Sequence, residues 1–159
     1  MQKNNTKGFT LIELLIVIAI IAILAAVVFV SLKPATRFES ARDARRQTDI
    51  ETIASALVTY QADNSGSFPA SVEALTLGSS YIVGTAASGC DSGCTATTTQ
   101  TACVDLAALV TGGYMGSVPQ DPSSGTAAKT LYYVTPNTSG TITAGACVPE
   151  GSSAISTTR

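Results

Sequence analysis

Three residues near the start of the chain combine reactive chemistry with an unusual setting. Gly8 and Phe9 precede Glu13, and from Phe9 to Leu32 that glutamate is the only charged side chain. The segment 14–30 contains no charge, no Gly and no Pro. A bilayer core about 30 Å thick requires about 20 apolar helical residues, so this part of the chain is long enough to cross one. A carboxylate inside such a helix costs about 3 kcal/mol, which indicates that Glu13 serves a function.

The heptapeptide Lys7-Gly8-Phe9-Thr10-Leu11-Ile12-Glu13 resembles the N-terminus of the type IV pilin and pseudopilin superfamily. In that family a short basic leader ends in Gly, a Phe follows, and a Glu lies four residues beyond the Phe. The resemblance implies that a prepilin peptidase cuts between Gly8 and Phe9 and then N-methylates Phe9. A carboxylate this close to lipid needs a partner. We therefore expect Glu13 to act in assembly by pairing with the new amino terminus of a neighbouring subunit, in competition with its own.

A signal anchor and a secretory signal peptide are the alternatives to a prepilin N-terminus. An ordinary signal anchor would contain the same apolar helix, with Glu13 reaching towards the membrane interface. A secretory signal peptide has an apolar core of about 7–15 residues, which is shorter than this one, and no clean small-x-small cleavage site follows. We therefore expect a leader over 1–8 and a transmembrane or filament-core helix over 9–32.

The composition indicates one modest domain with an anchor and gives little support for an enzyme. The chain has 159 residues, a formal net charge of −2 and no His, the commonest general base and metal ligand. No nucleophile elbow, phosphate loop or dinucleotide fingerprint occurs. We expect no enzymatic activity, no cofactor and no bound metal. After Arg46 there are two basic residues against eight acidic ones, so we expect no nucleic-acid partner.

Beyond the apolar segment the pattern predicts an amphipathic helix over 33–62. Pro34 marks an expected kink just past the membrane segment. Apolar residues then recur mostly at steps of three and four, as expected for one face of a helix. This stripe consists of Phe38, Ala41, Ile50, Ile53, Leu57 and Tyr60. On the polar side, the spacings of Arg45 and Arg46 to Asp49 permit weak helical ion pairs.

The remaining segment, 63–159, is predicted to be a small globular head, which gives an α+β fold. Turn residues end the long helix at 63–69. Short helices are expected over 71–77 and 102–110, and strands over 81–83, 131–135 and 141–148. We expect an antiparallel sheet of three or four strands packed on the amphipathic half of the long helix.

The segment Val118-Pro119-Gln120-Asp121-Pro122, with Gly113-Tyr114-Met115 before it, carries a second resemblance. It is similar to the region before the C-terminal sheet of the major pseudopilin of type II secretion. In that family Asp-Pro-Trp-Gly usually follows, with a calcium-binding loop further on, whereas this chain has no Trp. Because no cluster of acids follows Asp121, we expect this residue to cap a turn rather than bind calcium.

Four cysteines lie in the predicted head: Cys90, Cys94, Cys103 and Cys147. Four cysteines in a small exported head favour two disulfides, for which three connectivities exist. A four-cysteine zinc site is the alternative, although these spacings match a zinc ribbon poorly. We predict that Cys90 pairs with Cys94 through a tight turn, and that Cys103 pairs with Cys147.

These observations lead to two hypotheses of function. The first is a structural subunit of a type IV pilus-like or type II secretion pseudopilus filament, assembled from the inner membrane after leader cleavage. The second is a minor, tip-located pilin that binds a surface or cargo. The resemblance implies a homo-oligomeric filament, the prepilin peptidase and membrane assembly machinery as partners. It also implies a single-pass membrane protein with its head outside the cytoplasm.

Overall fold

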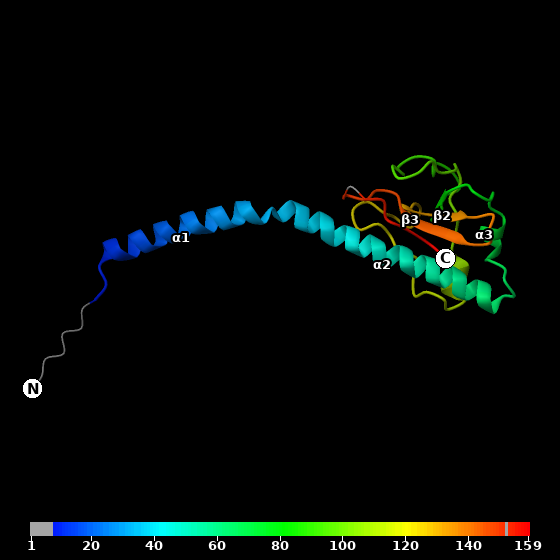
Figure 1. Ribbon diagram of the computed structural model, residues 1–159, viewed down its shortest axis with the longest axis horizontal. Helices are drawn as coiled ribbons and strands as arrows, with labels where there is room; N and C mark the ends of the chain where they lie inside the picture. Colours follow the sequence, from blue (N-terminus) through cyan, green and yellow to red (C-terminus); the bar gives the residue numbers. More distant parts are fainter. Residues whose placement is uncertain (1–7, 152) are drawn as a thin grey trace, which may run out of the picture. The chain divides into compact units, whose positions relative to one another are not determined.

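The computed structural model describes residues 8–151 and 153–159 of the chain. Except for Gly8, the predicted leader lies outside the described residues. The chain divides into two compact units at Phe38–Glu39. The first unit holds the apolar helix α1, and the second holds the head with most of helix α2 (Figure 1).

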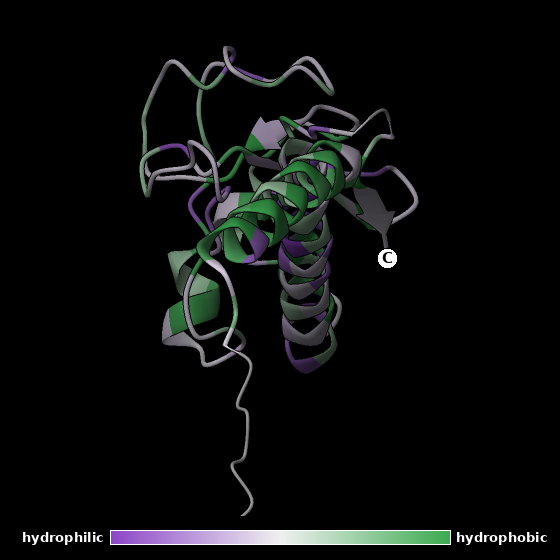
Figure 2. Cartoon of the chain, turned by 90° about the vertical axis from the view of Figure 1, so that its left-hand side faces the viewer, coloured by the Kyte–Doolittle hydropathy of each residue, from purple (hydrophilic) through white to green (hydrophobic). Residues whose placement is uncertain are grey.

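Helix α1 (Leu11–Leu32) is apolar over almost its whole surface and buries none of its side chains (Figure 2). Its 22 residues extend about 33 Å, which matches the thickness of a bilayer core. By length and composition, this part of the chain is the one candidate membrane span among the described residues.

The helix is interrupted at Lys33, where a break was expected from the following proline. Lys33 has φ 43° and ψ 66°, which lie in the left-handed region. A proline disfavours the right-handed helical conformation in the residue before it, so Pro34 accounts for the break. Helix α2 (Pro34–Asp63) then continues for 30 residues.

The predicted apolar stripe of α2 is confirmed in its second half only. Ile50, Ile53 and Leu57 are completely buried, and Tyr60 packs on the edge of the core. Phe38 and Ala41 are exposed, which corrects the prediction for the first half of the stripe. The helix ends at the predicted turn, where Gly66 adopts φ 91° and its N–H donates to the carbonyl of Gln61 at 2.8 Å.

The head contains a four-stranded antiparallel sheet in the order β1-β2-β3-β4. The strands are β1 (Tyr81–Ile82), β2 (Tyr132–Pro136), β3 (Ile142–Ala146) and β4 (Ser156–Thr158). The first three agree with the predicted strands to within two residues, and β4 was not predicted individually. The two short helices are α3 (Ala70–Glu73) and α4 (Ala107–Thr111), both shorter than predicted.

The two faces of the sheet are covered by different parts of the chain, because side chains alternate along each strand. Tyr132 and Val134 of β2 lie in the main core with the buried residues of α2. Leu131 and Tyr133 point to the opposite face, where they pack with the cysteines of the loop between β1 and α4. The head is therefore layered, with α2 on one face of the sheet and a disulfide-bonded loop on the other.

Gly145 illustrates how closely the strands of this sheet approach one another. It is paired with Tyr133 on the neighbouring strand. A Cβ atom at Gly145 would lie 2.3 Å from Cζ of Tyr133, so the ring of Tyr133 lies directly across the glycine. A larger residue at this position would displace the ring from the second face of the sheet.

Candidate processing and assembly site

Gly8 lies directly before Phe9 at the predicted cleavage position, and its own surroundings do not require a glycine. It is exposed, and a Cβ atom added to it would meet nothing within 4 Å. Its φ lies outside the left-handed region that favours glycine. The described surroundings of Gly8 therefore place neither a steric nor a backbone requirement for glycine at this position.

Thr10 and Glu13 close the first turn of α1 as a capping box. The Thr10 backbone N–H donates to Oε2 of Glu13 at 2.8 Å, and the Thr10 hydroxyl donates to the same oxygen at 2.7 Å. In return, Oγ1 of Thr10 accepts the Glu13 N–H at 3.3 Å. These bonds satisfy helix N–H groups that would otherwise lack partners. Glu13 thus has a local hydrogen-bond partner in Thr10, the residue that directly follows Phe9.

The surface around this capping box is apolar and uncovered. Phe9 is 89% exposed and Leu11 is 82% exposed. No residue of α1 is buried. A soluble monomer rarely exposes an apolar surface of this extent, so lipid or other protein must cover it.

Comparison with known proteins bears on this same part of the chain. Residues 3–29 match the family described as the prokaryotic N-terminal methylation motif. The chain is also 41% identical, over 64 residues, to the type II secretion system core protein G of Pseudomonas aeruginosa. That match covers 40% of this chain and 44% of the relative, so it spans less than half of either. No solved structure matches the chain.

These similarities support the type IV pilin and pseudopilin superfamily for this chain. The match to the methylation motif includes Gly8, Phe9 and Glu13, the residues on which the sequence resemblance rests. The long helix packed on a small antiparallel sheet agrees with the α+β fold predicted for that superfamily. The apolar helix and the matched family together indicate a membrane-anchored, pilus-associated protein.

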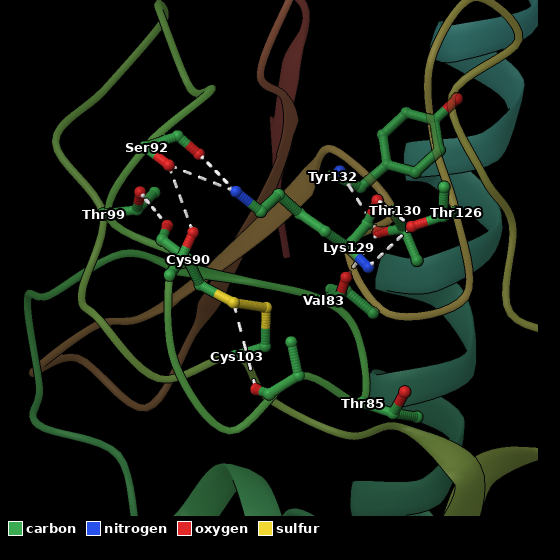
Figure 3. The surroundings of a disulfide bond; sticks show 12 residues. Val83, Thr85, Cys90, Ser92, Thr99, Cys103, Thr126, Lys129, Thr130 and Tyr132 are labelled. Atoms are coloured by element: carbon green, nitrogen blue, oxygen red, sulfur yellow. Dashed lines mark hydrogen bonds between the residues drawn. A yellow bond between two sulfur atoms is a disulfide. The ribbon is translucent and has the colours of Figure 1, made fainter.

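The head of this pilin-like chain contains two disulfides, and the predicted pairing was wrong. Cys90 is bonded to Cys103, and Cys94 is bonded to Cys147. Backbone hydrogen bonds explain the first pair, since the N–H of Cys90 donates to the carbonyl of Thr101. Figure 3 shows this loop, in which the Thr99 hydroxyl also donates to the carbonyl of Cys90 at 2.6 Å. The loop therefore folds back on itself and brings Cys90 to Cys103 rather than to Cys94.

The second disulfide joins the loop to the end of β3. The N–H groups of Thr95 and Ala96 donate to the carbonyl of Cys147, and so does the Thr95 hydroxyl at 2.9 Å. These bonds place Cys94 beside Cys147 with Cα atoms 4.3 Å apart. Cys103 also precedes α4 instead of lying in it, so the predicted helix did not place this cysteine correctly.

A buried charge cluster joins α2 to two distant segments of the head. Arg46 of α2 is completely buried, and its Nε donates to Oδ2 of Asp121 at 2.6 Å. Its two terminal nitrogens donate to Oδ1 of Asp43 at 2.8 Å and to Oε1 of Glu150 at 3.2 Å. Arg42 also donates from Nε to both carboxylate oxygens of Glu150 at 2.8 Å. Two arginines on one helix thus hold segments that lie far apart in sequence.

The pKa values in this cluster favour the charged forms. Burial opposes charge on Arg46 and Asp121, but their mutual hydrogen bonds raise the pKa of Arg46 and lower that of Asp121. The hydrogen bond from Arg42 and that from Ser123 lower the pKa of Glu150 to about 2. Burial also opposes the charge of Asp43, yet backbone N–H donors and Arg46 lower its pKa. The cluster therefore remains ionised throughout the neutral range.

Most of this cluster was not predicted from the sequence. Asp121 caps a turn as predicted, because its Oδ1 accepts the N–H groups of Ser123 and Ser124. Arg45 pairs with Asp49 at 3.7 Å, but Arg46 pairs with Asp43 rather than with Asp49. The available signal was periodicity: Arg46 lies four residues before Ile50, on the apolar stripe itself. A cation on the buried face of a helix implies that an anion lies next to it in the segment packed against that face.

Within the part of the chain that the structure describes, no group of three or more His, Cys, Asp or Glu side chains could hold a metal ion. Each carboxylate of the cluster is already paired with a guanidinium group, Asp43 and Asp121 with Arg46 and Glu150 with both Arg42 and Arg46. All four cysteines are engaged in disulfides. Asp121 in particular is committed to Arg46 and to its own turn, which leaves its carboxylate unsuited to a calcium ion.

Proposed function

We propose that this chain is a structural subunit of a type IV pilus-like or type II secretion pseudopilus filament. The observation that supports it best is α1, a completely exposed apolar helix whose one charge lies four residues after Phe9. Such a helix is stable in lipid and equally stable among copies of itself. Transfer from the membrane to a filament core therefore costs little apolar exposure.

Each part of the chain has a task in this function. A prepilin peptidase removes 1–8 by cutting between Gly8 and Phe9, and it methylates the new amine of Phe9. The helix over 9–32 lies first in the inner membrane and later in the filament core. The amphipathic helix over 33–62 carries the head, 63–159, on the side of the membrane away from the cytoplasm.

Glu13 receives a specific role in assembly. In the single chain its carboxylate accepts hydrogen bonds from Thr10. Cleavage would create a positive amine at Phe9, one residue before this cap. We propose that Glu13 exchanges part of its local bonding for the Phe9 amine of a neighbouring copy. A charge pair of this kind is strong in an apolar environment, and it fixes the register between adjacent helices.

Intact-mass measurement of the protein extracted from membranes tests the processing step. We expect a mature chain that begins at Phe9 with one added methyl group, and loss of Lys3 and Lys7 changes the formal side-chain charge from −2 to −4. A chain that retains 1–8, or begins elsewhere, contradicts the proposal. Sheared surface filaments then test the structural role, since a filament subunit is abundant in them whereas a tip subunit is scarce.

A further inference from the structure

The head contains an apolar groove that its own side chains leave open. The groove has a volume of about 350 Å³ and lies between the end of β1, helix α4 and the segments 117–120 and 127–130. Apolar side chains form its walls, among them Leu106, Val110 and Val118. Cavities of this size hold ligands larger than a single amino-acid side chain, so an aromatic ring fits within it.

One charged residue lines the groove. Asp105 is exposed, and its Oδ1 accepts the N–H of Ala107 at the start of α4. No ion pair of Asp105 occurs among residues 8–151 and 153–159. The groove therefore suits an occupant that combines a large apolar group with an adjacent cation.

The chain itself carries such a group on α2. Beyond α1, the described residues expose two large apolar side chains, Phe38 at 66% and Leu77 at 57%. Phe38 follows Arg37 directly, and within the described structure Arg37 forms no ion pair. Leu77 lies between Thr76 and Gly78 and has no adjacent charge. The chemistry of the groove therefore matches Phe38 and not Leu77.

We propose that the groove of one copy receives Phe38 of a second copy, with Arg37 of that copy beside Asp105. The proposal rests on the filament function, because assembly through α1 would bring several copies together. Phe38 and the groove lie on different surfaces of one chain, so the contact between two copies is heterologous. Repeated contacts of this type extend into an open helical array when the rotation between copies does not close a ring, as a filament requires. The docking thus supplies a contact outside the apolar core of the filament.

Photo-crosslinking in assembled filaments tests this docking directly. p-Benzoylphenylalanine in place of Phe38 has a similar aromatic shape, and the same amino acid in place of Leu77 is the matched control. We expect the first to form crosslinked dimers whose peptides map to 83–85, 105–111 or 117–120, and the control to form none there. Crosslinks from position 38 only to lipid, to α1, to another protein or within a single chain would overturn the docking.

Charge reversal gives a second measurement. Arg37→Glu is expected to reduce incorporation into filaments at least fivefold, and Asp105→Lys in the same chain is expected to restore it. Near-UV circular dichroism of each variant monitors the fold of the head. Normal incorporation of Arg37→Glu contradicts the pairing. If wild-type chains form filaments while position 38 does not reach the groove, only the docking is wrong; if they form no filaments, the proposed function itself fails.

Discussion

Helix α1 exposes all 22 of its residues. In contrast, the second compact unit, which consists of the head and most of α2, buries two apolar clusters, a charge cluster and two disulfides. The two regions therefore satisfy their side chains in opposite ways. The buried side chains of the head find their partners within their own chain, while α1 must find them in lipid or in other copies. Substitutions in α1 should consequently act on assembly, and substitutions in the buried clusters of the head should act on stability.

The largest expected effect is on assembly, and it comes from substitutions of Glu13 in α1. Glu13→Ala removes both the cap and the charge, whereas Glu13→Gln keeps an oxygen that accepts from Thr10 and removes the charge alone. If the charge pair with Phe9 drives assembly, both variants lose about 3 kcal/mol or more, which is roughly a hundredfold or more in incorporation. Both should remain processed and inserted in the membrane. The measurement is the ratio of filament to membrane protein by immunoblot.

The two Glu13 variants also distinguish charge pairing with Phe9 from helix capping by Thr10. If Glu13→Gln enters filaments as well as the wild type while Glu13→Ala does not, helix capping explains the requirement. Pairing with Phe9 would then be rejected. A change in the unfolding of the head in either variant would contradict the separation between the two regions.

The buried cluster of the head predicts the next largest effect. Arg46→Met leaves the buried carboxylate of Asp121 without its cation, which should lower the free energy of unfolding by about 3–5 kcal/mol. The neighbouring Arg45 offers a matched control, because its pair with Asp49 is long and its side chain is 65% exposed. Arg45→Met should cost about 1 kcal/mol or less. Urea unfolding of the processed protein in detergent, followed by circular dichroism, measures both.

Equal destabilisation by the two arginine variants would show that the cluster contributes no more than an exposed pair. Loss of filaments from Arg46→Met without loss of stability would also count against the comparison, since it would give the buried charge cluster a direct part in assembly.

Removal of the two disulfides should lower the free energy of unfolding by different amounts. The Cys94–Cys147 bond closes a sequence separation of 53, and Cys90–Cys103 closes one of 13. Chain entropy alone makes the first worth about 4 kcal/mol and the second about 3 kcal/mol. Replacing each pair by serines should therefore lower the unfolding free energy in that order. Non-reducing peptide mapping provides the control, because Cys90–Cys94 or Cys103–Cys147 peptides would contradict the structure.

The elements that sequence could predict are those determined by local pattern. The apolar run identifies α1, Pro34 identifies the break at Lys33, and the spacing of Ile50 and Leu57 identifies the buried face of α2. Strands β2 and β3 follow from their residue types and from the turn between them. In each case the controlling interactions lie within a few residues in sequence, or depend only on hydrophobicity.

What could not be predicted depends on contacts between distant segments. Arg46 lies 75 residues from Asp121 and 104 residues from Glu150, and no local spacing links them. The cysteine pairing failed for the same reason, because the backbone bonds of the loop decide which cysteines meet. Strand β4 is polar and mostly exposed, so only its pairing with β3 identifies it as a strand.

The smallest expected effect is the pH dependence of the head. Glu150 has a pKa of about 2, and the pKa values of Asp43 and Asp121 are also lowered, against about 4 in an unfolded chain. The stability that these carboxylates contribute is therefore complete above about pH 5 and is lost as the pH falls through the folded values. Glu150 is partly exposed, so solvent and salt screen its contribution to stability.

Glu150→Gln should flatten the curve of unfolding free energy against pH between about pH 2 and 5 and leave it parallel to wild type above that range. Curves that stay parallel down to about pH 2 would show that Glu150 is not held by Arg42.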